Sequence, residues 1–443
     1  MLYLLNMLRR RTVFCTFMMV AVSSYAARAQ LDTATIVSNL DTPWEILWGP
    51  DDWIWFTERK GRISRVHPST GELKILIDRI PDVHEQSESG LLGMALHPAF
   101  EAIPHVFVVY TYRPSGSIVE KLVRFTYDGD TLSDPHIILD NIRGAPNHNG
   151  SRLLFLPDTT LLMTTGDVTN QNLALDVHSL EGKILRLNPK GSIPADNPSS
   201  ASLIWSYGHR NAQGLVRLPD GKIYSSEHGP NNDDEVNLIL KAGNYGWPQV
   251  HGYCDRSSEM TYCNQNTVVE PVAAWTPTLA VAGLDYYHHD AIPSLKNSLI
   301  MVTLKERDIR ALKLNSARTQ VVSQQTYFDN AWGRLRDLCI SPDGRIYIAV
   351  SNQDGRGQPE PGDDRIVELS SGAVGIDYHI RRDLAGTPVG YRHVYPALKT
   401  GTALLFNIRG RKIPAHFISQ APHKVRGIAV ALTAGNRSFL MPY

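Results

Sequence analysis

The chain has 443 residues, of which 42% are hydrophobic and 20% are charged. This composition is typical of a folded protein and excludes a disordered one. Lys plus Arg and Asp plus Glu each number 44, so the formal net charge is zero. The chain therefore has no net electrostatic field that would attract nucleic acid, and nucleic acid is not expected as a partner. A charged ligand would have to be bound by a local cluster of charged side chains.

The first 29 residues have the pattern of a secretory signal peptide. Residues 9–11 are all arginine, residues 13–22 are an apolar run, and an Ala-Arg-Ala sequence ends at Ala29. The apolar run is shorter than the roughly 20 residues that a membrane helix needs, so an uncleaved anchor is the less favoured alternative. We expect cleavage near Ala29, a periplasmic or secreted mature protein and no stable membrane span.

A two-part unit recurs through residues 30–372. Its first half is a turn of the Pro-Asp-Gly type followed by a strand, in copies that begin at Gly49, His97, Leu156, Leu218, Ile292 and Ser341. Such turns mark hairpins, because proline presets φ and glycine accepts positive φ. Alternation of Ile346, Ile348 and Val350 with polar neighbours predicts half-buried strands. Six copies predict an all-β, six-bladed β-propeller, with a pair of β-sandwiches as the alternative.

The last 71 residues, 373–443, depart from this repeat. No carboxylate follows Asp383, whereas basic residues continue to the C-terminus. We describe this segment as a basic C-terminal extension. An appended module, a disordered tail and an unrelated translated extension are all compatible with its composition.

Three cysteines follow the predicted signal peptide. Cys254 and Cys263 flank the polar segment DRSSEMTY. In an oxidising compartment a short-loop disulfide between them is expected, which would stabilise the fold by roughly 2–3 kcal/mol. Cys339 lies in an apolar strand pattern and is predicted to be a buried free thiol.

His148 and Asp167 are candidates for a catalytic pair. His148 precedes a predicted strand in PNHNG, and Asp167 ends the hairpin that this strand begins. A carboxylate that reaches back to a loop histidine orients the imidazole and makes it more basic. The neutral ring could then accept the proton of a substrate hydroxyl. For an isolated pair, a surface histidine is the alternative.

Basic and amide side chains at other blade edges predict the binding of an anionic ligand. Arg210 and Asn211 lie in GHRNAQG, where they offer bidentate donors and a carboxamide. Lys305 lies in TLKERD, and Arg334 and Arg336 alternate in WGRLRD, so that a strand would direct both guanidiniums to one face. These cations suit a ligand with several carboxylates, and ordinary surface charge is the alternative.

Residues 227–235, EHGPNNDDE, resemble a binding loop for a hard cation such as Ca²⁺, which takes carboxylate and carbonyl oxygens. Candidate ligands are the carbonyls of Gly229 and Pro230 and the side chains of Asp233, Asp234 and Glu235. The spacing differs from that of an EF-hand, and a solvated acidic turn is the alternative.

Motifs of several other enzyme classes are absent from the sequence. It contains no Walker-type loop, no G-x-G-x-x-G after a predicted strand, no G-x-S-x-G elbow and no H-E-x-x-H. Nicotinamide or flavin binding through a Rossmann unit is therefore unsupported.

Taken together, the motifs resemble the soluble dehydrogenases of glucose and aldose sugars that depend on pyrroloquinoline quinone (PQQ). The resemblance covers about residues 39–369 and is strongest in LGMALHP, GKILRLNPKGSIPADNP, GHRNAQG and the stretch from SEHGPNNDDEVNL to NYGWP. The family implies a six-bladed propeller with PQQ and Ca²⁺ on one face, and the oxidation of aldoses at C1 to lactones.

The resemblance also implies roles for the catalytic and cofactor residues. His148 would remove the proton of the C1 hydroxyl while hydride passes to PQQ. Asp167 would orient His148, and Arg210 would lie beside the reacting quinone carbonyl. The residues implied to hold PQQ are Asn211, Thr278, Lys305, Arg334 and Arg336.

Metal sites are implied at four positions. Gly229 and Pro230 would give backbone carbonyls to the catalytic Ca²⁺, which would act as a Lewis acid. Glu235 and Tyr245 match positions that hold a second, structural Ca²⁺ in members of the family.

The sequence departs from the family pattern around the expected sugar site. Glu88 stands where the glucose enzymes have glutamine, and Asn147 stands where an aspartate usually precedes the catalytic histidine. The region after Trp247 is shortened, although Tyr262 is retained and is a candidate to line the sugar site. These differences affect the expected choice of sugar more than the expected cofactor.

The sequence is therefore interpreted as a PQQ- and Ca²⁺-dependent aldose dehydrogenase that passes electrons to an external quinone or cytochrome. Two alternatives remain: a secreted propeller that binds its partner without redox chemistry, and a propeller lactone hydrolase. A homodimer is an open alternative to a monomer.

Overall fold

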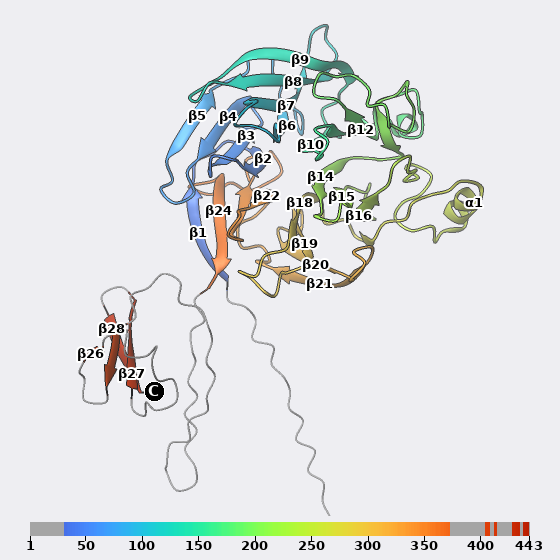
Figure 1. Cartoon of the computed structure of the whole chain (residues 1–443). Helices are drawn as coiled ribbons and strands as arrows, with labels where there is room; N and C mark the ends of the chain where they lie inside the picture. Colours follow the sequence, from blue (N-terminus) through green and yellow to red (C-terminus); the bar gives the residue numbers. More distant parts are fainter. Residues whose placement is uncertain (1–30, 373–403, 408–411, 414–427, 435–436, 443) are drawn as a thin grey trace, which may run out of the picture. The chain divides into compact units, whose positions relative to one another are not determined.

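The computed structural model of the chain describes residues 31–372 and, further on, 404–407, 412–413, 428–434 and 437–442 (Figure 1). The predicted signal peptide and most of the C-terminal extension lie outside these ranges. Within them, no helix has both the length and the apolar character that crossing a membrane requires.

Residues 31–372 form six four-stranded antiparallel sheets arranged as a ring, which confirms the predicted propeller (Figure 1). Blade 1 consists of β2 (Pro43–Trp48), β3 (Ile54–Glu58), β4 (Arg62–Val66) and β5 (Leu73–Ile77). Blade 2 consists of β6 (Leu91–Leu96), β7 (His105–Tyr112), β8 (Val119–Tyr127) and β9 (Leu132–Arg143). Blade 3 consists of β10 (Gly150–Phe155), β11 (Leu161–Thr165), β12 (Lys183–Leu187) and β13 (Ile204–Tyr207).

The second half of the ring repeats the arrangement. Blade 4 consists of β14 (Ala212–Arg217), β15 (Ile223–Glu227), β16 (Asp234–Ile239) and β17 (Ala273–Trp275). Blade 5 consists of β18 (Val281–Tyr287), β19 (Ser298–Thr303), β20 (Ile309–Leu314) and β21 (Val321–Tyr327). Blade 6 consists of β22 (Leu335–Ile340), β23 (Ile346–Val350), β24 (Arg365–Ser371) and β1 (Leu31–Val37).

Each predicted turn copy joins the first and second strands of one blade. In blade 6, Ile340 pairs with Ile346 across the turn, and the amide of Gly344 donates to the carbonyl of Ser341 at 2.9 Å. Gly344 has φ of +86°, a conformation that glycine adopts without steric cost. The local turn chemistry therefore sets where each blade folds back on itself.

The ring is closed by the two ends of the propeller sequence. β1 pairs antiparallel with β24, with Leu31 opposite Ser371 (Figure 1). The outermost strand of blade 6 is therefore the first strand of the described residues, and the other three strands of this blade are the last of the propeller.

The hydrophobic core lies between neighbouring blades. Ile300 and Val302 of blade 5 pack in one cluster with Ile346 and Ile348 of blade 6. The expectation of a half-buried strand is wrong for β23, because Tyr347 and its neighbours are buried on the other face as well. A blade is covered on both faces by the adjacent blades, so its middle strands have no solvent face.

The cysteine predictions are confirmed. Cys254 and Cys263 form a disulfide in the excursion between β16 and β17, and Cys339 is a buried free thiol. The disulfide encloses most of α1 (Ser257–Gln265), whose Glu259 side chain accepts a hydrogen bond from the amide of Arg256 at 3.1 Å.

Residues 375–443 form a unit of their own. Its four strands form an antiparallel sheet in the order β26-β25-β27-β28. They are β25 (Leu404–Asn407), β26 (Lys412–Ile413), β27 (Ile428–Ala434) and β28 (Arg437–Pro442). The boundary of the propeller at residue 372 stays a prediction.

Candidate active site

A cavity of about 360 Å³ lies on one face of the propeller. Because the strands of a blade alternate in direction, the loops between blades and the turns between second and third strands meet at this face. The predicted site residues that line the cavity are Glu88, His148, Arg210, Gly229, Pro230, Thr278, Lys305, Arg334 and Arg336. The sequence therefore identified residues from five of the six blades that the fold brings to one place.

His148 lies in the loop before β10 with φ of +61°. Its Nδ1 atom lies 2.7 Å from Oδ1 of Asp167, and its Nε2 atom lies 3.1 Å from Nη2 of Arg210. A guanidinium can only donate hydrogen bonds, so Nε2 is the acceptor, and the ring proton on Nδ1 is directed at the carboxylate. The predicted His–Asp pair is present, and the ring nitrogen that could take a proton faces the side of Arg210.

Arg210 is held by the neighbouring residues of blade 4. Its Nη1 atom donates to the carbonyl of His228 at 3.1 Å, and its amide donates to the carboxylate of Glu227. The other oxygen of Glu227 lies 2.9 Å from Nδ1 of His209, which is fully buried. Burial lowers the pKa of Arg210, although surrounding carboxylates act in the opposite direction.

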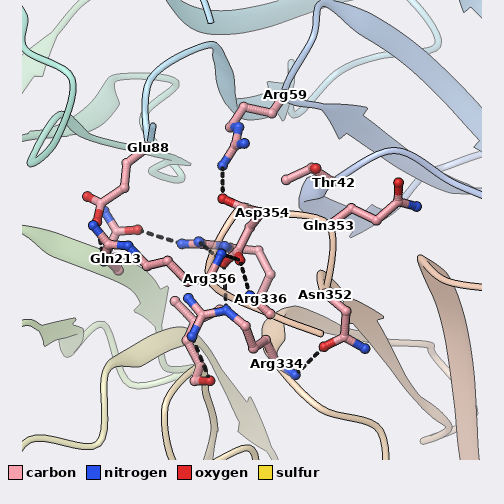
Figure 2. Close-up of polar contacts among 12 residues, drawn as sticks. Thr42, Arg59, Glu88, Gln213, Arg334, Arg336, Asn352, Gln353, Asp354 and Arg356 are labelled. Carbon is pink, nitrogen blue, oxygen red and sulfur yellow. Dashed lines mark hydrogen bonds and ion pairs between the residues drawn. The ribbon is translucent and has the colours of Figure 1, made fainter. Parts of the chain in front are cut away.

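Arg334 and Arg336 share Asp354, a residue that the sequence prediction missed (Figure 2). Nε of Arg334 donates to Oδ2 of Asp354 at 2.7 Å, whereas Nη2 of Arg336 lies 3.8 Å from the same oxygen. Although burial acts to raise it, these two arginines lower the pKa of Asp354. Two neighbouring buried arginines need a carboxylate to balance their charge. The spacing of the acidic residues after β23 does not indicate which of them fills this role.

Arg336 is the less completely paired of the two. Its Nη1 atom donates to Oε1 of Gln213 at 3.1 Å, but its Nε atom is buried without a hydrogen-bond partner among the described residues. Burial lowers the pKa of Arg336 to about 10, against the pull of Asp354. The cavity wall therefore carries a guanidinium that an anionic ligand would satisfy.

Glu88 forms a polar contact at the cavity with Arg356, which the sequence prediction also missed (Figure 2). Nη1 of Arg356 lies 2.9 Å from Oε1 of Glu88, and Nη2 of Arg356 donates to Asn147 at 3.3 Å. The second carboxylate oxygen of Glu88 accepts the amide of His148 at 3.3 Å. Burial acts to raise the pKa of Glu88, but His228 and Arg356 lower it. Glu88 thus pairs with Arg356 and supports the histidine loop.

Gly229 and Pro230 line the cavity, as predicted, in the turn between β15 and β16. Asp234 holds this turn, because its Oδ1 atom accepts the amide of Gly229 at 2.8 Å and its Oδ2 atom accepts the amide of Leu279 at 2.8 Å. A Cβ atom at Gly229 would lie 2.0 Å from the carbonyl oxygen of Asn232, so the turn requires glycine.

The side chains of the described residues do not form a metal site by themselves. Within the described ranges, no group of three or more His, Cys, Asp or Glu side chains could hold a metal ion. A cation at the cavity would therefore depend on backbone carbonyls such as those of Gly229 and Pro230, together with oxygens of a ligand.

Several predicted residues lie outside the cavity lining. Asn211 is buried, with its Oδ1 atom accepting the amide of Gly150 at 3.1 Å and its Nδ2 atom without a partner in the described structure. Tyr262 lies on α1, where its hydroxyl is 3.5 Å from Nδ2 of Asn244. The structure does not bring Tyr262 to the cavity, because α1 belongs to the excursion between β16 and β17.

Glu235 and Tyr245 also lie away from the cavity lining. Burial raises the pKa of Glu235 to about 8, and its Oε1 atom accepts the amide of Gly252 at 2.8 Å. The hydroxyl of Tyr245 donates to the carbonyl of Leu238 at 2.7 Å, and its ring stacks on His209 at 4.4 Å. Their predicted role at a structural Ca²⁺ stays a prediction.

Comparison with known proteins identifies close relatives across the propeller. The chain is 32% identical to quinoprotein glucose dehydrogenase B of Acinetobacter calcoaceticus, over 76% of this chain and 88% of the relative. It is 28% identical to the aldose sugar dehydrogenase YliI of Escherichia coli K12, over 75% of this chain and 93% of the relative.

A solved structure shows the same fold. The PQQ-bound aldose sugar dehydrogenase of Streptomyces coelicolor matches with a TM-score of 0.68 and 31% identity, over 77% of this chain and 99% of that one. Residues 40–358 match the family described as glucose / sorbosone dehydrogenase. The resemblance drawn from the motifs is thus confirmed, and the chain belongs to the glucose / sorbosone dehydrogenase family.

Proposed function

We propose that this protein is a PQQ- and Ca²⁺-dependent aldose dehydrogenase that oxidises the C1 hydroxyl of an aldose to the lactone and passes the electrons to an external acceptor. The observation that carries the proposal is one cavity lined both by His148, which is hydrogen-bonded to Asp167, and by Arg336, whose Nε atom has no hydrogen-bond partner among the described residues. The pair suits removal of a hydroxyl proton, and the arginine suits an anionic cofactor. Relatives named as glucose and aldose sugar dehydrogenases support the same reaction.

The polar atoms left over in this part of the structure fit PQQ, a quinone with three carboxylates. Nε of Arg336 and Nδ2 of Asn211 are buried donors without partners among the described residues. Arg334 and Lys305 add positive charge to the cavity wall. These four residues would hold the cofactor, with Thr278 beside Lys305, whose Nζ atom donates to the carbonyl of Thr278 at 2.7 Å. When bound, PQQ supplies the hydride acceptor, which no protein side chain provides.

Gly229 and Pro230 would hold the catalytic Ca²⁺ through their carbonyl oxygens. The rigid turn fixed by Asp234 supports this assignment, since it leaves the carboxylate of Asp234 occupied by backbone amides. The ion would supply Lewis-acid polarisation.

His148 would take the proton of the substrate hydroxyl on Nε2. Arg210 occupies this nitrogen in the present structure, so the guanidinium must release it before the ring accepts a proton. Asp167, 2.7 Å from Nδ1, would then stabilise the imidazolium that forms. Glu88 supports the same loop by accepting the amide of His148 and would contribute to the choice of sugar.

Dye-linked oxidation of aldoses by purified apo-protein tests the proposal, with PQQ and Ca²⁺ added singly and together. We expect activity with both and its loss on chelation. If no activity is found, a parallel titration with PQQ distinguishes two causes. Absence of PQQ binding would overturn the proposal, whereas PQQ binding without turnover of any aldose would overturn the assigned substrate class.

Replacement of the base gives a second test. We expect His148→Ala to lower kcat by at least about a hundredfold, because general bases typically contribute that much. PQQ affinity should stay unchanged. His136→Ala, at an exposed position on β9, is the matched control and should leave kcat unchanged. A loss of less than about tenfold for His148→Ala would show that another group takes the proton.

Periplasmic or secreted localisation is part of the proposal. The Cys254–Cys263 disulfide supports it, since such bonds form and persist in oxidising compartments. N-terminal sequencing of the mature protein from the native cell fractions should find cleavage near Ala29, and an intact N-terminus would contradict this part of the proposal.

A further inference from the structure

Trp247 is not among the residues that line the cavity, but it contacts both neighbours of the His148 imidazole. Its indole Nε1 atom donates to Oδ2 of Asp167 at 3.0 Å. The guanidinium carbon of Arg210 lies 5.4 Å from the centre of its ring. Asp167 and Arg210 in turn bind the two ring nitrogens of His148. One side chain therefore supports both contacts that orient the predicted base.

The two oxygens of Asp167 have different partners. Oδ1 lies against Nδ1 of His148 and also accepts the amide of Thr169 at 2.9 Å, whereas Oδ2 receives the indole of Trp247. The Asp167 side chain is 2% exposed, so water cannot easily replace a lost donor. The indole bond thus fixes which carboxylate oxygen faces the histidine.

Trp247 is itself firmly placed. It is 9% exposed, and its amide donates to the carbonyl of Gly208 at 3.1 Å, just before the segment that carries Arg210. It does not line the cavity, so any effect on the reaction must pass through its neighbours.

We propose that Trp247 is a positioning residue, which holds Asp167 by a hydrogen bond and Arg210 by a cation–π contact so that both engage the His148 ring. The proposal rests on the proposed function only in assigning the general base to His148. The arrangement of the imidazole itself is a property of the folded protein and can be measured without turnover.

Trp247→Phe separates the two contacts, because it removes the N–H and retains an aromatic face for Arg210. We expect kcat to fall by about tenfold or more, since hydrogen bonds to charged groups have that weight. KM and the Kd for PQQ should change by less than about twofold, because Trp247 does not itself line the cavity and phenylalanine keeps an aromatic face for Arg210. A kcat within about twofold of the parent would overturn the proposal.

Trp205→Phe is the matched control. Trp205 also lies under a guanidinium, that of Arg186 at 5.1 Å, but its Nε1 atom has no partner within the described part of the chain. Trp205 does not line the cavity. We expect its replacement to leave kcat unchanged.

A double-mutant cycle with Asp167→Asn identifies the route. If Trp247 acts through Asp167, the combined variant should lose less than the product of the two single effects. Independent multiplication of the two losses would contradict the proposed route, and a matching loss of folded protein in urea would indicate a merely structural role.

Nuclear magnetic resonance of histidine-labelled protein gives a readout that needs no activity. The ring signals of His148 should shift in Trp247→Phe and stay in place in Trp205→Phe. If Trp247→Phe fails to fold, the indole N–H signal of Trp247 should shift in Asp167→Asn instead. If neither the ring signals of His148 nor the indole signal of Trp247 moves, the positioning role is wrong. If the unmodified protein is inactive but the expected signal shifts are observed, only the proposed function is contradicted.

Discussion

Arg152 of β10 and Arg336 of β22 are two buried arginines on the first strands of their blades, and they differ in how fully their donors are used. Nη1 of Arg152 lies 2.8 Å from Glu45 and 2.7 Å from Asp337, and its Nε atom donates to the carbonyl of Gln213 at 2.6 Å. Arg336 has one good side-chain partner, Gln213, and a carboxylate at 3.8 Å, while its Nε atom is unpaired within the part of the chain that the structure describes. The two are adjacent, since Nη2 of Arg152 donates to the carbonyl of Arg336.

The difference separates a structural charge from one that is available to a ligand. Burial acts to lower the pKa of Arg152, but Asp337 and Glu45 outweigh it and raise the pKa. Burial prevails at Arg336 and lowers its pKa to about 10. Removal of a completely paired buried arginine would leave its carboxylates uncompensated, whereas a buried arginine with a spare donor beside a cavity indicates a binding site.

The largest expected effect is on stability at Arg152. Arg152→Ala leaves Glu45 and Asp337 buried without their cation, and we expect a loss of about 3–5 kcal/mol in the free energy of unfolding. Urea titration followed by fluorescence measures it. Adding Glu45→Gln and Asp337→Asn should recover part of the loss, because the uncompensated charges disappear. A single-variant loss below about 1 kcal/mol would remove the distinction between the two arginines.

A smaller effect of a different kind is expected at Arg336. Arg336→Ala should weaken PQQ binding by roughly thirtyfold or more, about 2 kcal/mol, with little loss of stability. Fluorescence titration of apo-protein gives the affinity. Arg186→Ala is the control, since Arg186 pairs with Asp158 and Asp196 outside the cavity. Unchanged affinity in Arg336→Ala would place the cofactor elsewhere.

A third prediction concerns Asp285, a carboxylate close to the completely paired Arg152. It lines a second cavity, of about 350 Å³, together with Glu45, Arg152 and Asp337, and burial raises its pKa to about 7. Between pH 4 and 7 the folded state then holds a proton that the unfolded state has released, so stability falls as pH rises across this range. Asp285→Asn should remove this fall and stabilise the protein at pH 8 by up to a few kcal/mol.

Urea midpoints at pH 4 and pH 8 check the prediction for Asp285. The gain should be large at pH 8 and small at pH 4. Asp290→Asn, at an exposed position paired with Lys296, should give no such pH dependence. Equal gains for Asp285→Asn at both pH values would show that its ionisation is not the cause.

The fold was predictable because its signals are local. Each Pro-Asp-Gly type turn specifies a hairpin within about ten residues, as the pairing around Gly344 shows. Two groups of site residues were likewise identifiable, because the members of each group lie at the ends of the same strand or of the same hairpin. They are His148 with Asp167, and Arg334 with Arg336.

The missed residues depend on contacts between distant loops. Asp354 and Arg356 lie in an irregular loop after β23, and only the ring geometry directs one to the arginines and the other to Glu88. Trp247 was part of a recognised motif, but its hydrogen bond joins it to Asp167, 80 residues earlier. Residue spacing carries no information about such pairings.

The pairing of β1 with β24 also imposes an order of events on the nascent chain. The strand that begins at Leu31 emerges early from the ribosome, and its partner ends at Ser371. Until that partner is made, the edge of β1 presents unpaired amides and carbonyls to other chains. Contacts of such large sequence separation form slowly. The completion of the last blade therefore sets the length of the aggregation-sensitive interval during biogenesis, independently of how fast the individual hairpins form.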